Sequence, residues 1–234
     1  MKSGEKAILF ALLGLMIVAL YAAFLYAPTE KVMGTVQRIF YFHVAAAWTS
    51  LLSFFFVFLG GALYLWKRKV EYDRFAYAAA ELGVLFSSIV LVTGPIWAKP
   101  VWNVWWTWDP RLTSTFVLWL IYVAYLLFRS SLHQHPSIRT YASVYGLIAF
   151  VDVPIVWMSI RWWRTIHPKV LTAKKIISDG QTEGGLEPSM WIAVLICFGA
   201  MLLLYFVLMR MRMSVERIRD QVYELQENIQ EAEA

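Results

Sequence analysis

Six long apolar segments constrain the fold more than any other feature of this sequence. A helix that crosses a bilayer needs about 20 predominantly apolar residues. Segments of this kind cover residues 7–26, 39–66, 76–97, 112–128, 140–158 and 189–209. Because 60% of the residues are hydrophobic and only 16% are charged, the chain has more apolar surface than one soluble core can bury. We therefore expect an all-α integral membrane protein with six transmembrane helices.

The sequence changes character after Arg212, where the last apolar segment gives way to a polar stretch. We accordingly divide the chain into a transmembrane domain over residues 1–212 and a cytoplasmic C-terminal helix over residues 213–234. Apolar residues in that helix recur at alternating spacings of three and four, at Val215, Ile218, Val222, Leu225 and Ile229. This a/d pattern of a short heptad repeat is typical of a docking helix, but a solvated tail can also carry it.

The distribution of Lys and Arg predicts how the helices are oriented. Six spans place both termini on one side of the membrane, and that side carries more Lys and Arg than the other. Because loops rich in these residues stay in the cytoplasm, we expect both termini there. This topology brings three features to the outer surface: His43 near the start of the second span, the connection 98–111, and His167 after the fifth span. His133 and His135 fall on the inner side.

The outer connection between the third and fourth spans is rich in tryptophan. Five of the twelve residues in 97–108 are Trp. Pro100 and Pro110 bracket a stretch that we expect to form about two helical turns along the membrane surface. On such a helix one face would carry three indoles, those of Trp102, Trp105 and Trp106. This density indicates either an aromatic belt at the membrane interface or a platform for a flat aromatic ligand.

The two outer histidines are candidates for ligand binding. Small residues share the helical face of His43 and leave space beside its imidazole, namely Ala46, Ala47 and Ser50. His43 alone could be a packed, hydrogen-bonded histidine, and His167 alone could be an ordinary loop residue. Two neutral imidazoles from different segments can, however, ligate a haem iron from opposite sides.

Other polar residues have both structural and functional interpretations. Asp109 suits the N-cap of the fourth span, with Pro110 at the first helical position, and it could also position the Trp segment. Asp152 could bond backbone groups freed by Pro154 inside the fifth span, whereas Glu81 is more easily solvated. The cations near His167 are either a solvated loop or a partner for carboxylates: Arg161, Arg164, Lys169, Lys174 and Lys175. Cys197 is the single cysteine, which excludes an internal disulfide and covalent haem attachment through a C-x-x-C-H motif.

The run from Thr93 to Ser114 resembles the Trp-rich WWD signature of haem-handling proteins in cytochrome c maturation. The sequence there reads Thr-Gly-Pro-Ile-Trp-Ala-Lys-Pro-Val-Trp-Asn-Val-Trp-Trp-Thr-Trp-Asp-Pro-Arg-Leu-Thr-Ser. Phe-His-Val at 42–44 and Trp-Trp-x-Thr-x-His at 162–167, with the six-span layout, are similar to the haem exporter protein C (CcmC) family. The resemblance extends to about Arg212. The chain departs from the pattern at Ala45, at Ala98 and Asn103, where glycines are usual, and at Pro110.

The resemblance implies a site and a set of partners. Haem b would bind as cargo on the periplasmic side of the bacterial cytoplasmic membrane, with His43 and His167 as axial ligands to its iron. The residues expected to hold the macrocycle are Trp102, Trp105, Trp106, Trp108, Asp109 and Arg111. The expected partners are the haem chaperone CcmE, the ABC transporter subunits CcmA and CcmB, the small membrane protein CcmD and the lipid bilayer, with no nucleic acid.

We therefore expect a protein that binds and delivers haem, and no enzyme. A transmembrane electron carrier of the cytochrome b type would need paired histidines at two depths, but only His43 lies near a span. A channel for haem would need more polar residues inside the spans than Asp152 and Glu81. A purely structural subunit remains the third alternative.

Overall fold

The computed structural model describes residues 3–30, 33–132, 135, 137–167, 175–176, 182–183 and 185–233. Its helices are α1 (Ser3–Tyr21), α2 (Arg38–Lys67), α3 (Val70–Trp102), α4 (Pro110–Ser131), α5 (Ile138–Ala149), α6 (Asp152–Trp162) and α7 (Pro188–Glu233). A π-helical turn, η1 (Ala22–Tyr26), extends α1, and a 3-10 turn, η2 (Thr35–Gln37), precedes α2. Two short strands, β1 (Lys175–Ile176) and β2 (Thr182–Glu183), pair antiparallel.

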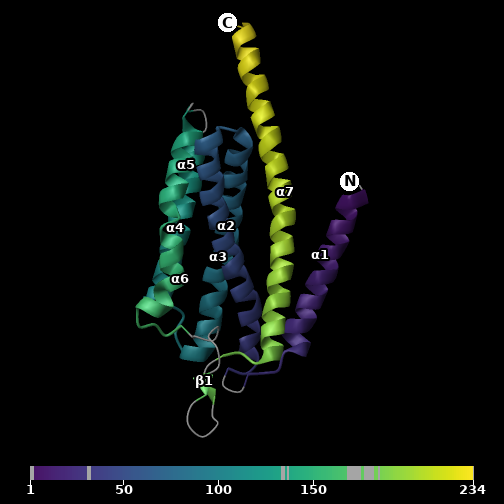
Figure 1. Cartoon of the computed structure of the whole chain (residues 1–234), viewed down its shortest axis with the longest axis vertical. Helices are drawn as coiled ribbons and strands as arrows, with labels where there is room; N and C mark the ends of the chain where they lie inside the picture. Colours follow the sequence, from purple (N-terminus) through teal and green to yellow (C-terminus); the bar gives the residue numbers. More distant parts are fainter. Residues whose placement is uncertain are drawn as a thin grey trace.

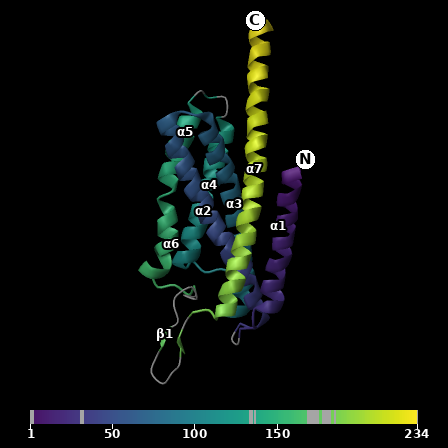
Figure 2. The same ribbon diagram turned by 45° about the vertical axis from the view of Figure 1, so that its right-hand side comes forward.

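The described helices provide six segments long and apolar enough to cross a membrane, with α5 and α6 together forming the fifth. This confirms the prediction of an all-α membrane protein with six spans. The helices run roughly side by side, and the N-terminus of α1 points the same way as the C-terminus of α7 (Figures 1 and 2). The start of α2, the end of α3 and the start of α4 lie at the opposite end, beside β1.

Small residues allow α2 and α3 to pack closely along their length. Gly60 on α2 lies directly against the backbone of α3. A Cβ added at Gly60 would be 2.9 Å from the carbonyl oxygen of Tyr72, which is too close for the two helices to keep their positions. A run of three alanines in α3, residues 78–80, is fully buried. Lipid tails are as apolar as the helix surfaces, so close van der Waals packing of this kind takes the place of the hydrophobic effect. The α2–α3 pair is therefore a firm scaffold for any side chain placed between the two helices.

Two boundaries differ from the sequence-based expectation. The surface helix expected after Pro100 is wrong, because α3 continues through Pro95 and Pro100 and ends only at Trp102. Membrane helices tolerate proline where neighbouring groups satisfy the freed backbone, so proline was a poor marker of this helix end. The fifth span breaks into α5 and α6 around residues 150–151, which puts Pro154 in the first turn of α6, where no N–H is needed.

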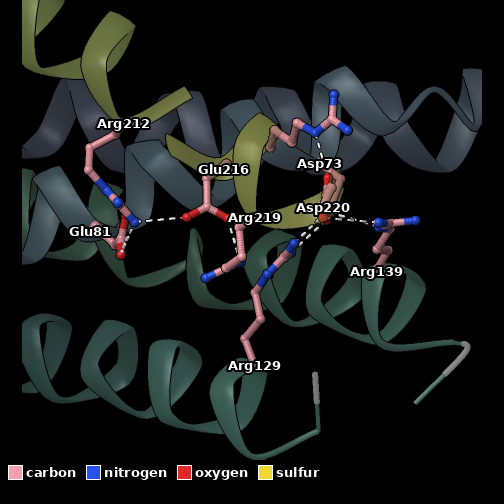
Figure 3. Close-up of polar contacts among 9 residues, drawn as sticks. Asp73, Glu81, Arg129, Arg139, Arg212, Glu216, Arg219 and Asp220 are labelled. Carbon is pink, nitrogen blue, oxygen red and sulfur yellow. Dashed lines mark hydrogen bonds and ion pairs between the residues drawn. The ribbon is translucent and has the colours of Figure 1, made fainter. Parts of the chain in front are cut away.

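An ion-pair network joins α7 to the bundle at the end where the termini lie (Figure 3). Asp73 on α3 is almost fully buried, and its two carboxylate oxygens accept hydrogen bonds from Nη1 and Nη2 of Arg129 on α4. Arg212 donates to Glu81 at 2.6 Å and to Glu216 at 2.8 Å. The remaining pairs are Arg74–Asp220, Arg139–Asp73, Arg139–Asp220 and Arg219–Glu216. Glu81, which we expected to be easily solvated, has a side chain that is 27% exposed and pairs with Arg212, a partner that the sequence did not indicate.

Helix α7 runs without a break across the domain boundary expected at Arg212. The division into two domains stays a prediction. The five heptad residues lie on the exposed side of the helix, with side chains between 45% and 62% exposed: Val215, Ile218, Val222, Leu225 and Ile229. The apolar seam thus faces away from the ion-pair network.

Candidate functional site

His43 lies on α2 and faces α3. Its Nδ1 is 2.8 Å from the hydroxyl oxygen of Thr93, which is 50 residues later in the sequence. Gly94 also lies beside the ring, since a Cβ at this position would be 3.5 Å from Cε1 of His43, an ordinary van der Waals contact. The neighbouring Ala46 and Ser50 are buried, as expected of a face that packs closely. His43 is therefore a half-buried imidazole whose orientation depends on the α2–α3 contact.

His167 belongs to the segment that follows α6, and the carboxylate of Asp109 holds that segment. Asp109 accepts a hydrogen bond from the hydroxyl of Thr165 at 2.6 Å and from the backbone N–H of Ile166 at 2.9 Å. The hydroxyl oxygen of Thr165 accepts a hydrogen bond from the backbone N–H of His167 at 3.0 Å. Asp109 is also the N-cap of α4, where it accepts from the N–H of Arg111 at 3.0 Å. One carboxylate thus fixes both the start of α4 and the approach to His167.

The two histidines and Arg111 come together at one end of the bundle. His167 and Arg111 lie within electrostatic range of the His43 imidazole. The Arg111 guanidinium donates to the backbone carbonyl of Val156 on α6, so it also ties α4 to the helix that leads to His167. The structure therefore brings together three predicted site residues from α2, α4 and the segment after α6.

The tryptophans do not share one helical face, because Trp102 ends α3 while the next residues are not helical. Trp102 packs edge-on against Trp97, with ring centroids 4.8 Å apart. Trp106 is partly buried and packs edge-on against Trp108 and Phe116. Trp105 and Trp108 are 58% and 74% exposed. Of the five indoles in residues 97–108, three are therefore partly buried, those of Trp97, Trp102 and Trp106, and two face outward.

Asn103 explains how the Trp segment leaves α3. It is the helix C-cap and has a left-handed backbone with φ of 58°. Glycine is the usual residue in this conformation, and asparagine is among the few others that tolerate it. Lys99 donates to both the backbone and the side-chain oxygen of Asn103, at 3.1 Å and 3.0 Å. Asparagine can therefore replace the glycine expected at position 103, because it tolerates the left-handed backbone that the position requires.

Buried polar atoms in the Trp segment lack hydrogen-bond partners among the described residues. They are Nε1 of Trp97, Nε1 of Trp106 and the hydroxyl oxygen of Thr107. A buried donor without an acceptor costs about 1–3 kcal/mol. An acidic, largely aromatic ligand would supply both an acceptor for these groups and a surface for the indoles. The residues present therefore fit a haem with its carboxylates.

The remaining candidates lie apart from this arrangement or outside the described residues. Asp152 borders a crevice of about 300 Å³ between α4 and α6, and its Oδ2 has no hydrogen-bond partner among the described residues. The expected bond to backbone groups near Pro154 is therefore not formed by that oxygen. Arg161 and Arg164 are exposed, whereas Lys169 and Lys174 lie outside the described residues and Lys175 is described only as part of β1.

Thr93 and Thr165 were not singled out by sequence reasoning. Thr93 begins the Trp-rich run, and Thr165 stands two residues before His167. A threonine in a motif gives no indication of its hydrogen-bond partner, so only the packing of α3 on α2 and of the segment after α6 on Asp109 identifies these contacts.

Comparison with known proteins places these residues in a family. A family model described as heme exporter protein C matches residues 3–228. The chain is 33% identical over 205 residues to heme exporter protein C of Escherichia coli, covering 86% of this chain and 80% of that protein. It is 30% identical over 214 residues to heme exporter protein C of Bradyrhizobium diazoefficiens, covering 91% and 78%.

A mitochondrial relative is also similar. The cytochrome c biosynthesis ccmC-like mitochondrial protein of Marchantia polymorpha is 36% identical over 149 residues, which cover 64% of this chain. The chain spans 63% of that protein and 56% of the corresponding Arabidopsis thaliana protein.

Proposed function

Because the chain belongs to the haem exporter protein C family, we propose that it binds haem b as cargo and delivers it for cytochrome c biogenesis. The family is a membrane transporter component and not an enzyme. The observation that carries the proposal is the proximity of His43 and His167, which are 124 positions apart in the sequence yet lie within electrostatic range of each other.

Each group at the site has a distinct part in holding haem. His43 and His167 are the axial ligands to the iron, since neutral imidazoles are common haem ligands. Trp102, Trp105, Trp106 and Trp108 supply aromatic surface to the macrocycle. The cation of Arg111 and the indole N–H of Trp106 attract the haem carboxylates, while Asp109 supports the His167 segment. The outward-facing Trp105 and Trp108 leave an accessible edge from which an acceptor protein can take the haem.

The proposal extends to location and partners. We place the protein in the bacterial cytoplasmic membrane, with both termini in the cytoplasm and the haem site on the periplasmic side. The support is the excess of Lys and Arg on the side of the termini. The start of α2, which carries His43, lies at the opposite end of the bundle (Figure 1).

On the periplasmic side the CcmE chaperone takes the haem. CcmA and CcmB, as an ABC transporter, and CcmD complete the complex, and the α7 seam is a docking surface for the ATPase subunit or a second copy.

Removing either histidine tests the proposal. The absorption spectrum and haem content of the purified protein should change in both His43→Ala and His167→Ala, because each loses one axial ligand. His135→Ala is the matched control, since His135 is an exposed histidine between α4 and α5, at the other end of the bundle. The ligand assignment is wrong if both site variants keep the spectrum and haem content of the wild type.

A further inference from the structure

The Thr93 hydroxyl contacts two backbone carbonyls and the imidazole of His43, and these contacts together fix its proton. Its hydroxyl oxygen is 2.7 Å from the backbone carbonyl oxygen of Ile89, 3.5 Å from that of Val90 and 2.8 Å from Nδ1 of His43. Carbonyl oxygens only accept, so the contacts to Ile89 and to His43 compete for the single hydroxyl proton unless it is donated to Ile89. Toward His43 the hydroxyl is then an acceptor. Both contacts are satisfied only if Nδ1 of His43 carries a hydrogen.

The protonated Nδ1 decides which nitrogen of His43 can bind a metal. A neutral imidazole has one N–H and one nitrogen with a free lone pair. With the hydrogen on Nδ1, the lone pair is on Nε2. We infer that Thr93 is a positioning residue that holds His43 in the Nδ1–H tautomer and so presents Nε2 as the ligand atom for the haem iron. This inference rests on the proposed function for its second half, whereas the tautomer itself is a property of the haem-free protein.

The surroundings make this arrangement rigid. Thr93 lies on α3 and His43 on α2, and close contacts between small residues join these two helices. The bond from Thr93 to Ile89 follows the usual back-bonding of helical threonine to the carbonyl four residues earlier. Hydrogen bonds from a ligating histidine to a neighbouring acceptor set the ring orientation and raise the basicity of the other nitrogen. Thr93 is therefore placed to do for His43 what carboxylates and carbonyls do in other metal sites.

The test is a set of threonine variants in the full-length protein. Thr93→Val keeps the shape of the side chain and removes the hydroxyl, whereas Thr93→Ser keeps the hydroxyl. Thr49→Val is the matched control, because Thr49 is a buried α2 threonine whose hydroxyl makes the same kind of back-bond, donating to the carbonyl oxygen of Ala45 at 2.8 Å. Nitrogen-15 NMR of histidine-labelled, haem-free protein reports the tautomer directly. The chain has four histidines, and His43→Ala identifies the signal of His43.

The expected result is a tautomer change confined to Thr93→Val. Wild type, Thr93→Ser and Thr49→Val should show protonated Nδ1 and unprotonated Nε2 at His43, and Thr93→Val should gain the Nε2–H form. Haem retention should fall about 10- to 100-fold in Thr93→Val, the usual loss when a metal-bound histidine loses its supporting partner. Recovery in Thr93→Ser would tie this loss to the hydroxyl.

Two outcomes separate the inference from the proposed function. If Thr93→Val keeps the wild-type tautomer at His43, Thr93 does not control the imidazole and the inference is overturned, whatever happens to haem. If the tautomer changes but haem retention does not, while His43→Ala loses haem, Nε2 presentation is not what binding requires and the inference is again overturned. Unchanged haem binding in His43→Ala would instead overturn the ligand assignment of the proposed function.

Discussion

At the scale of single residues, the site depends on side chains that support the histidines. Asp109 receives three hydrogen bonds, from Thr165, Ile166 and Arg111. Two of these hold the segment that carries His167 and the third caps α4. A carboxylate used in this way orders its neighbours and has little capacity left for a ligand. The sequence predicted the cap, but the link to Thr165 joins positions 56 residues apart and depends on how the chain returns after α6.

We predict that Thr165→Val lowers haem retention and gives a spectrum like that of His167→Ala. The variant removes the hydroxyl that connects Asp109 to the N–H of His167 but leaves the cap of α4 intact, so α4 should keep its stability. Absorption spectra and haem content of the purified variant are the measurements, and Thr165→Ser should behave as wild type. A Thr165→Val protein with normal spectrum and haem content would show that the Asp109 link does not position His167.

At the scale of elements, the number and order of the membrane spans were predictable and the helix ends were not. Apolar length is a local property of the sequence, so the six spans could be read directly. The end of α3 depends on the left-handed conformation of Asn103, and α3 passes through two prolines that would end a helix in water. The contact between Thr93 and His43 requires the packing of α3 on α2, which no local pattern specifies.

The segment between α3 and α4 gives a prediction about the haem carboxylates. Trp106→Phe keeps an aromatic ring but removes the buried N–H that has no hydrogen-bond partner among the described residues. We expect weaker retention of haem, by a few-fold to about 10-fold, the equivalent of about 1 kcal/mol for one hydrogen bond. Haem dimethyl ester, which lacks free carboxylates, should discriminate less between the variant and the wild type. Equal losses for both ligands would mean that the indole N–H does not contact a carboxylate.

At the scale of the whole molecule, the two ends have different chemistry. One end gathers the histidines and tryptophans, and the other holds the ion pairs among α3, α4, α5 and α7 (Figure 3). Helix α3 belongs to both ends, with Asp73 in its first turn and Thr93 near its last turns. The ion pairs stabilise the arrangement of helices far from any ligand contact.

Arg129→Ala should therefore lower stability without altering the haem spectrum. The variant leaves the buried Asp73 without its main partner, and breaking a buried pair in this way costs about 3–5 kcal/mol. Thermal unfolding in detergent measures the loss. Arg68→Ala is the matched control, because the exposed Arg68 at the same end makes one surface hydrogen bond, to Thr140. A changed haem spectrum in folded Arg129→Ala protein would contradict the separation of the two ends.

The unbroken length of α7 also makes it a fixed spacer. Its 46 residues correspond to about 70 Å of helix at 1.5 Å per residue, whereas a bilayer with its headgroups is about 40–45 Å thick. About 25 Å of helix therefore stands clear of the membrane, and ion pairs brace its base against the bundle. Whatever the tip touches is held at a set height above the lipid, so inserting or deleting whole turns near the tip would raise or lower that contact in steps of about 5.4 Å.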